Sequence, residues 1–379
     1  MIKYIYQHTD WPLFKWNNEE LSGLLGQVRN MQGVLMGKMA SLGFQLQEEA
    51  LLETMTLDVL KSSEIEGEKL NQAQIRSSIA RRLGFDIADM VHSARNVDGI
   101  VEMMLDATQN YRQPLSEDRL FAWHSALFPT GRSGMYKIEV GQYRTGEMQV
   151  VSGAMGKEKV HFEALPPQSL REEMDKFMVW LNSDLNIDPV VKAAIAHLWF
   201  VTIHPFDDGN GRIARAISDM LLARSDNSPQ RFYSMSNQIL TERKKYYAAL
   251  ERSQHGYMDI TNWLTWFLIC LKSALHATEY TLQSVLRKAT FWNKHAKTTL
   301  NARQQLMLNK LLDGFKGKLK SSKWAKITKC SHDTALRDIK DLIEKGILKQ
   351  EEAGGRSINY NLADWVLEQK NAIFTNKKI

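Results

Sequence analysis

Hydrophobic residues along most of this chain recur three or four positions apart, which is the spacing of one face of an α-helix. The spacing begins at Leu21 and runs to Met39, and it continues in a second helix expected over residues 47–67. Methionines and leucines at this spacing most often form a core. It also persists across residues 83–126, where the expected core positions are Val91, Ala94, Val97, Ile100, Val101, Met104 and Leu105.

The most apolar segment, residues 189–203, is hydrophobic on almost every side, which is typical of a helix buried in the middle of a domain. Pro205 disfavours helical dihedral angles at His204, so the helix should end there. Residues 208–211 are typical of a turn. The inward face of the helix that follows should consist of Ile213, Ala216, Ile217, Met220 and Leu221.

The pattern changes between Pro129 and Pro167, where glycines recur and two short runs have β character. Residues 148–152 and 159–162 are expected to pair as a β-hairpin. A surface hairpin without function is the alternative. Helical spacing resumes at 169–181, and after a polar loop at 225–230 further helices are expected at 241–253 and 260–275.

The last 80 residues form a separate pattern. Helices are expected at 303–312, 322–327 and 332–344, followed by strands at 347–350 and 358–362 around Gly354-Gly355-Arg356. This order resembles a winged helix-turn-helix, whose third helix enters the DNA major groove. The candidate contacts are His332, Asp333, Thr334, Arg337 and Lys340 on that helix and Arg356 at the wing.

Charge supports that interpretation only in part. Residues 301–379 contain 16 Lys and Arg against 9 Asp and Glu, whereas the whole chain has a net charge of +6. The rest of the chain is therefore close to neutral. Four acidic residues would oppose DNA phosphates, namely Asp333, Asp338, Asp341 and Glu344. Modules of this kind also serve as protein contacts or dimer surfaces, so DNA binding is one of two hypotheses.

Composition excludes several classes of protein. A chain of 379 residues with ordinary apolar and charged fractions predicts a soluble protein of two or three domains. Cys270 and Cys330 are too few for a disulfide framework and have no metal-ligand spacing. The first residues lack the apolar region of a signal peptide, and the run 263–275 is too short to span a membrane. We therefore expect a cytoplasmic protein without a membrane partner.

The candidate chemistry lies between the two central helices. Gly209, Asn210 and Gly211 allow backbone amides to approach a ligand, and the start of a helix favours anions. Arg212 and Arg215 are three positions apart, so both can reach one phosphate chain.

Two further residues complete this set. Asp208 offers an oxygen ligand suited to Mg²⁺, and His204 is a candidate general base. Separately, each residue has a structural alternative: Asp207 and Asp208 can form the turn, Arg215 can pair with Asp219, and His204 can be a structural histidine. No single turn or cap needs all of these groups, so the segment as a whole indicates nucleotide phosphate binding.

A second informative segment, residues 62–67, closes the helix that ends near Gly67. Glu64 and Glu66 lie at the end of a helix that has partial negative charge, which costs about 0.3–1 kcal/mol per exposed group. This mismatch indicates that one glutamate has a cationic partner elsewhere. Two solvated glutamates are the alternative.

Residues 204–215 resemble the Fic signature, HPFx[D/E]GNGRxxR, at every defined position. The likeness extends over most of the first 290 residues. Fic proteins are mostly adenylyltransferases that move AMP from ATP to a protein hydroxyl. The resemblance implies that His204 deprotonates a Ser, Thr or Tyr hydroxyl and that Asp208 holds Mg²⁺. It further implies that the phosphates are bound by Gly209, Asn210, Gly211, Arg212 and Arg215, with Phe206 packed beneath the loop.

The same family suggests roles for other segments. Ser62, Glu66 and Gly67 match the Fic inhibitory pattern [ST]xxxE[GN], which implies that Glu66 reaches Arg215 and prevents productive ATP binding. The expected hairpin is similar to the Fic flap that holds the target, and Gly141-Gln142-Tyr143-Arg144 resembles the segment leading into it. Tyr246 or Tyr247 would contact the adenine, although core packing explains them equally well. Fic domains commonly pair, which implies a homodimer.

The sequence therefore predicts a mainly α-helical protein with a helical region at 1–95, a Fic core at 96–290 and a winged helix at 295–379. The predicted function is a self-inhibited protein adenylyltransferase. The alternatives are a Fic enzyme that transfers another phosphate-containing group or removes AMP, and a DNA-binding regulator whose core senses nucleotide.

Overall fold

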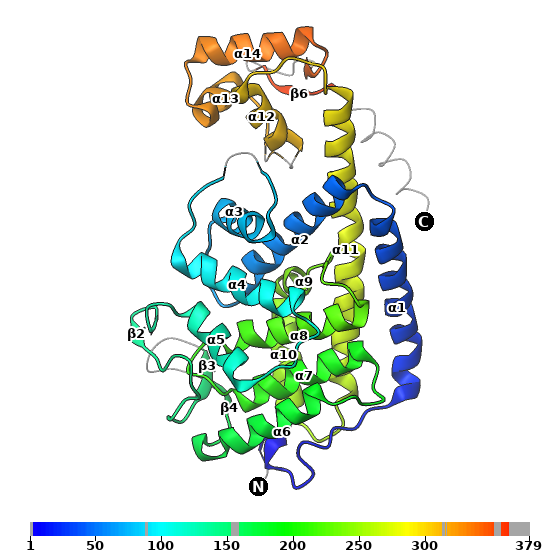
Figure 1. Cartoon of the computed structure of the whole chain (residues 1–379), viewed down its shortest axis with the longest axis vertical. Helices are drawn as coiled ribbons and strands as arrows, with labels where there is room; N and C mark the ends of the chain where they lie inside the picture. The colour runs from blue at the N-terminus through cyan, green and yellow to red at the C-terminus, as the bar shows by residue number, and fades with distance from the viewer. Residues whose placement is uncertain are drawn as a thin grey trace. The chain divides into compact units, whose positions relative to one another are not determined.

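The computed structural model describes residues 3–87, 90–152, 159–312, 315, 317–351 and 358–363. The chain divides into two compact units, Met1–Thr281 and Leu282–Ile379. Both are mainly helical, and the strands are short (Figure 1). The predicted fold class, mainly α, is confirmed. The hairpin turn at 153–158 and the wing residues Gly354–Arg356 lie outside the described residues.

The first unit begins with a 3-10 turn, η1 (Ile5–Gln7), and three helices: α1 (Asn18–Ala40), α2 (Phe44–Ile65) and α3 (Gln72–Leu83). The side chains of Asn17 and Asn71 accept backbone N–H groups and so cap α1 and α3. The chain of α1 runs beside α11, and Lys272 donates to Gln27 between them (Figure 1).

Five helices form the centre of this unit: α4 (Arg95–Gln109), α5 (Glu117–Leu127), α6 (Leu170–Asn182), α7 (Pro189–Ile203) and α8 (Asn210–Asp226). Every residue from Ala193 to Ile203 is buried, as the apolar segment predicted. Helix α7 begins with Pro189 behind an Asp188 cap, and α8 packs along it. The loop that connects α7 to α8 therefore lies at one end of this pair of helices.

Three more helices complete the first unit. They are α9 (Met235–Thr241), α10 (Arg243–Gln254) and α11 (Thr261–Lys294), the last of which extends past residue 281. Helix α9 was not predicted, and α11 is longer than the expected 260–275.

Two antiparallel strand pairs lie between α5 and α6. The first joins β1 (Arg132–Ser133) to β2 (Tyr136–Lys137), and the second joins β3 (Gln149–Ser152) to β4 (Lys159–Glu163). The β3–β4 pair is the predicted hairpin. Its register shifts between Val150 and Val151, which is the signature of a β-bulge.

The second unit contains α12 (Ala302–Leu312), α13 (Ser321–Thr328), α14 (His332–Glu344) and the antiparallel strands β5 (Leu348–Gln350) and β6 (Tyr360–Leu362). Trp324 is fully buried in a core with residues of α12 and α14. The order of helices and strands follows the sequence prediction, and the wing tip is outside the described residues.

Two local predictions were wrong. Residues 85–87 and 90–94 are not helical, and Val91 and Ala94, expected in the core, are exposed. The expected loop at 225–230 is shorter, because α8 continues to Asp226. No helix in the described part of the chain is long and apolar enough to cross a membrane.

Candidate active site

The loop between α7 and α8 is shaped by two residues with left-handed backbone angles. His204 has φ +54° and ends α7, with its N–H donating to the Phe200 carbonyl at 3.0 Å. Gly209 has φ +83° and precedes α8; a Cβ at this position would come within 2.9 Å of the Phe128 ring. The loop therefore turns sharply at both ends and places the start of α8 beside His204.

Side chains inside the loop hold this conformation. The Asn210 amide accepts from the Phe206 N–H at 3.0 Å and donates to the Phe206 carbonyl at 2.7 Å. Phe206 is fully buried and stacks on His124 with ring centroids 4.2 Å apart. The side chain of Asn210 is thus used to brace the loop, which leaves backbone groups at the start of α8 for a ligand.

His124 of α5 supports the same loop from below. Its Nε2 lies 3.2 Å from the Asp208 carbonyl, and its Nδ1 accepts from the Gly141 N–H at 3.2 Å. His124 is fully buried, which fits a packing role rather than that of a second base. Burial also lowers the pKa of His124 to about 4, so the ring is neutral near pH 7.

His204 has the tautomer that a general base needs. Its Nδ1 lies 3.1 Å from the Val201 carbonyl, and a carbonyl oxygen can only accept, so Nδ1 carries the proton. Nε2 is then unprotonated. Burial is the main cause that lowers the pKa of His204, and the positive charge of Arg144 adds to it. The half-buried imidazole is therefore ready to accept a proton at neutral pH.

His204 lines a cavity of about 600 Å³ in the first unit. The walls come from the α7–α8 loop, the start of α8, the β3–β4 hairpin and α10, and Glu66 projects into it from the end of α2. The candidate base, both loop aspartates and the start of α8 thus share one cavity.

Arg215 of α8 is almost completely buried, and its partners come from α2. Nη2 lies 2.8 Å from Glu66 Oε1, while Nε and Nη2 donate to the hydroxyl and carbonyl oxygens of Ser62, each at 2.9 Å. Arg215 Nη1 is buried without a hydrogen-bond partner among the described residues. The alternative pairing of Arg215 with Asp219 is not present, because Asp219 pairs with Arg231 at 2.9 Å.

Arg212, one turn earlier, also pairs with the segment after α2. Its Nη1 lies 3.0 Å from Glu68 Oε2, and its guanidinium lies over the Phe128 ring at 4.9 Å. Arg212 Nε is buried and unpartnered in the described part of the chain. Sequence reasoning did not single out Glu68, because no pattern marked it.

Asp208 provides the only metal-ligand candidate that the motif suggested. Its Oδ1 accepts from the Gly209 N–H at 2.6 Å and its Oδ2 from the Ser133 hydroxyl. No group of three His, Cys, Asp or Glu residues gathers within the described ranges. Mg²⁺ is commonly bound by one or two carboxylates together with substrate phosphates, so one carboxylate beside a phosphate site fits that ion.

The two candidate adenine contacts differ sharply. Tyr246 is buried, and its hydroxyl lies 2.9 Å from His197 Nε2, so its main role is packing. Tyr247 is 39% exposed and lines the cavity with the Arg243 guanidinium 5.5 Å from its ring. Tyr247 is the better placed of the two for stacking on a base.

Arg144 positions His204 from the segment before the hairpin. Its Nε donates to the His204 carbonyl at 2.8 Å, and its backbone N–H donates to the Pro205 carbonyl at 3.0 Å. A third bond runs from Nη1 to Gly146. In the sequence, residues 141–144 only resemble the segment that precedes a Fic flap. The hydrogen bonds from Arg144 to the α7–α8 loop were not predicted.

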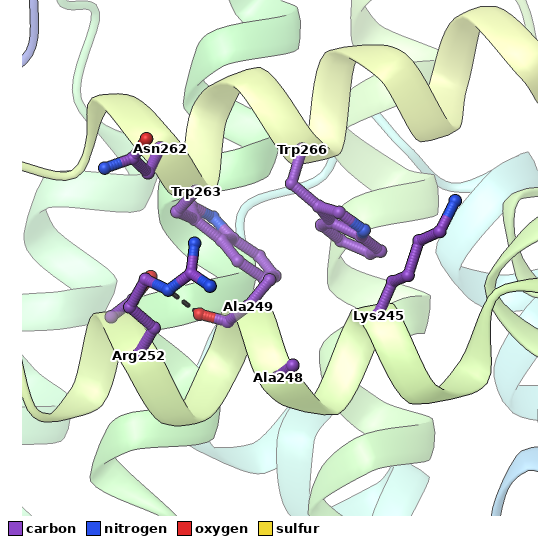
Figure 2. Close-up of a pocket in the computed structure, with 8 residues that line it drawn as sticks. Lys245, Ala248, Ala249, Arg252, Asn262, Trp263 and Trp266 are labelled. Carbon is purple, nitrogen blue, oxygen red and sulfur yellow. Dashed lines mark hydrogen bonds between the residues drawn. The ribbon is translucent and has the colours of Figure 1, made fainter.

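A second cavity, of about 240 Å³, lies between α10 and α11 (Figure 2). Trp263 and Trp266 of α11 stack with ring centroids 5.1 Å apart and face α10, which contributes Lys245 and Arg252. The lining contains no carboxylate or imidazole. It therefore has no general base, and the first cavity is the stronger candidate for catalysis.

The first unit is thus mainly helical, and the start of α8 lies beside His204 at one cavity. Residues 114–222 match the family model Fic/DOC family. Residues 4–85 match a domain of unknown function (DUF4172).

Relatives share parts of this chain. Protein adenylyltransferase fic-1 of Caenorhabditis elegans is 35% identical over 121 residues, which are 31% of this chain and 21% of that protein. Protein adenylyltransferase Fic of Drosophila mojavensis is 27% identical over 217 residues, 56% of this chain and 38% of that protein. The chain thus spans well under half the length of these relatives. A Fic family protein from Desulfovibrio desulfuricans G20 shares the fold at 20% identity and a TM-score of 0.50, covering 91% of this chain and 96% of that one.

Proposed function

We propose that the first unit is a protein adenylyltransferase that restrains itself through Glu66. It transfers AMP from ATP to a Ser, Thr or Tyr hydroxyl of a target protein. The observation that carries the proposal is the Glu66 carboxylate on Arg215 at the start of α8, in the same cavity as the unprotonated Nε2 of His204. The relatives' names, protein adenylyltransferase, support this reaction class.

In the proposed reaction the target oxygen attacks the α-phosphorus of ATP. The bond from that phosphorus to the pyrophosphate oxygen breaks, and the hydroxyl proton moves to His204 Nε2. A positioned general base typically contributes a factor of about 10²–10⁴ in rate. Mg²⁺, held through Asp208, would supply charge neutralisation for the phosphates. Arg144 keeps His204 in place through its carbonyl.

Three features of α8 suit it to bind the phosphates. The first turn of the helix has free N–H groups and a favourable dipole. Arg212 Nε and Arg215 Nη1 are buried donors without partners in the described residues, which a triphosphate would satisfy. A methyl group at Gly211 would collide with Glu66 Oε1, so this glycine leaves room for an anion directly above the helix.

The same geometry accounts for restraint. Glu66 places a carboxylate where a phosphate oxygen would bind, and it pairs with Arg215, whose side chain is only 2% exposed. A bound triphosphate would lose one arginine contact and face a like charge at short range. Moving Glu66 away should therefore restore productive ATP binding.

The hairpin suits a protein target. Strand β3 pairs only with β4 within the described residues, which leaves its other edge free for an added strand. β3 and β4 both line the cavity that contains His204. A target segment on β3 would thus lie at the cavity wall and present its hydroxyl to the base.

The test uses ATP labelled separately at the α and γ phosphates. We expect Glu66→Gly to raise α-label transfer to protein by at least tenfold over wild type. Glu64→Gly should leave transfer unchanged, because Glu64 pairs with Lys61 and not with the motif. His204→Ala in the Glu66→Gly background should bind ATP and transfer nothing. Transfer of γ label would indicate kinase chemistry instead, and no transfer by a folded Glu66→Gly protein would favour a nucleotide sensor.

A second candidate function concerns the second unit, which we propose binds DNA through α14. Arg337 and Lys340 are exposed on this helix. Asp338, by contrast, is engaged inside the unit with Arg303 at 2.7 Å. The exposed face of α14 is therefore less acidic than its sequence suggests, because Arg337 and Lys340 balance the exposed Asp333 and Glu344.

A further inference from the structure

Helices α2 and α8 meet through contacts that recur one turn apart on each helix. At the end of α2, Glu66 pairs with Arg215 and lies where a Cβ at Gly211 would collide with it. One turn earlier on α2, the Ser62 hydroxyl accepts from Arg215 Nε at 2.9 Å. Contacts therefore move four positions back along α2 as they move four positions forward along α8. Residues four apart share one face of a helix, so the next turn of each helix should continue the series.

The next turn brings two carboxyl groups together. Asp58 of α2 is four positions before Ser62, Asp219 of α8 is four positions after Arg215, and the two aspartate side chains form a hydrogen bond. Asp219 is 2% exposed and Asp58 is 7% exposed. An ionised carboxylate can only accept hydrogen bonds, so a hydrogen bond between two carboxyl groups requires a proton. The buried pair therefore holds one proton.

The partners of the two carboxyl groups place this proton on Asp219. Asp58 Oδ1 accepts from the Ser234 hydroxyl and from the Ser236 N–H at 3.1 Å, which favours its ionised form. Asp219 Oδ2 is buried and has no hydrogen-bond donor among the described residues. Burial raises the pKa of Asp219 well above its ordinary value, and the negative charge of Asp58 adds to the rise. A neutral Asp219 that donates to Asp58 satisfies both groups.

The other charges in this region do not replace the proton. The titratable and charged groups around the pair come from α1, α8 and the loop before α9: Arg29, Asp226, Arg231 and Tyr233. Arg231 Nη2 lies 2.9 Å from Asp219 Oδ1, whereas Arg29 pairs with Asp188 at 2.9 Å. Burial raises the pKa of Tyr233 well above its ordinary value, so its hydroxyl stays neutral. The Arg231 guanidinium thus faces three carboxyl groups, and ionising all of them would leave excess negative charge in the interior.

We propose that Asp58 and Asp219 share one proton that positions the inhibitory helix α2 on α8, and that restraint by Glu66 lasts only while this proton is bound. The inference rests on the proposed function, because it concerns the release of Glu66. When the proton leaves to solvent, two carboxylates repel each other across the interface. Helix α2 then separates from α8, and Ser62 and Glu66 leave Arg215 to ATP. Neither aspartate lines the nucleotide cavity, so both are positioning residues.

Restraint should therefore weaken as the pH rises. A carboxyl group whose pKa is raised by folding keeps its proton at low pH and loses it as the pH rises through that pKa. Restraint is measured as the rate of α-label transfer by Glu66→Gly divided by the rate with Glu66 intact, which cancels the effects of pH on His204 and on ATP. We expect this ratio to fall at least fivefold between pH 6 and 9.5 in the otherwise wild-type protein.

Substitution by asparagine distinguishes a shared proton from a merely structural contact. Asp219→Asn still donates to Asp58 but cannot ionise, so its ratio should stay at the low-pH value throughout. Asp58→Asn should also remove the pH dependence, and it replaces Asp219→Asn in the test if that variant does not fold. Asp226→Asn is the matched control, because Asp226 is a buried carboxyl group of α8 whose partners come from α1 and the loop before α9. It should keep the wild-type pH dependence, and an equal fall of the ratio in Asp219→Asn and wild type would overturn the inference.

Hydrogen exchange of the α2 amides gives a second readout that needs no transfer. Protection factors of residues 58–65, corrected for the intrinsic exchange rate at each pH, should fall at least tenfold between pH 6 and 9.5 relative to those of α7. They should stay constant in Asp219→Asn. Constant protection of α2 in the wild-type protein would overturn the inference, even if the protein transfers AMP. If folded Glu66→Gly transfers no α label, the proposed function fails, and the exchange result still decides whether the proton positions α2.

Discussion

At the scale of single residues, Gly67 decides how the inhibitory segment meets the motif. Its φ of +86° ends α2 in a left-handed turn, and the Glu68 N–H returns to the Ser63 carbonyl at 3.0 Å. The chain therefore reverses between two glutamates. Glu66 pairs with Arg215 at 2.8 Å and Glu68 with Arg212 at 3.0 Å, so one short turn occupies both arginines of the motif.

Glu68 should therefore weaken ATP binding together with Glu66. The Arg212–Glu68 pair is partly exposed, and such pairs contribute about 0.2–1 kcal/mol. Glu68→Gln should tighten ATP binding about two- to fivefold, as measured by calorimetry in a His204→Ala background that prevents turnover. Glu64→Gln, which removes a carboxylate that pairs with Lys61, is the control. Equal affinities of the two variants would show that Glu68 does not compete with phosphate.

At the scale of secondary-structure elements, the parts that sequence predicted best have local signals. Pro189 and Asp188 start α7, Pro205 ends it, and Gly209 starts α8, all within a few residues of the element they define. Helix α9 has a local signal in its Ser234 cap, but its seven residues are too few to show helical spacing. The length of α11 was underestimated. Residues 85–87 and 90–94 were mistaken for helix because Val91 and Ala94 have helical spacing, although both residues are exposed.

The residues of the candidate site were predicted or missed for the same reason. The motif residues from His204 to Arg215 were visible because they are contiguous. Arg144 reaches His204 across 60 positions, and no local pattern encodes that contact. The bulge in the β3–β4 hairpin depends on how two strands align, which a single sequence does not specify. Contacts made by packing and register were therefore the ones missed.

The support of the motif loop by α5 has a consequence for acid stability. The folded protein binds a proton at His124 only near pH 4, because burial lowers the pKa to about 4, whereas an exposed histidine in the unfolded chain binds one near pH 6.5. The unfolded state thus binds more protons between these values. Stability that is present above about pH 6.5 is lost as the pH falls towards 4, by up to about 3 kcal/mol.

Replacing His124 should flatten this dependence. We expect His124→Gln to be less stable than wild type at pH 7.5, since it loses the stacking on Phe206. Its free energy of unfolding should then fall less between pH 6.5 and 4.5 in urea titrations. His92→Gln, at an exposed position before α4, is the control and should keep the wild-type slope. If the free energy of unfolding of His124→Gln falls with pH as steeply as that of wild type, groups other than His124 take up the protons.

At the scale of the whole molecule, two units of different charge share one chain. The first, Met1–Thr281, contains the nucleotide-site candidate and has 29 basic against 34 acidic side chains, whereas the second, Leu282–Ile379, has 20 basic against 9 acidic side chains. Two of the acids expected to oppose DNA have partners within the second unit: Asp338 pairs with Arg303, and Asp341 pairs with Lys345 at 2.6 Å. Asp338 is thus neutralised inside the unit and Asp341 by its neighbour Lys345, whereas Asp333 and Glu344 are exposed on α14.

The last prediction concerns the exposed side of that helix. If α14 binds DNA, each phosphate contact releases counterions, and the logarithm of the affinity falls with the logarithm of salt by about 0.9 per contact. Arg337→Ala with Lys340→Ala should lower that slope by about 2 and weaken binding at low salt. Lys310→Ala, on α12, should do neither. Because His204 lies in the other unit, His204→Ala should bind DNA as wild type does. If DNA binding does not depend on salt concentration, or if the α14 variants bind as wild type does, the second unit is a protein-contact module. The DNA-binding regulator is then excluded.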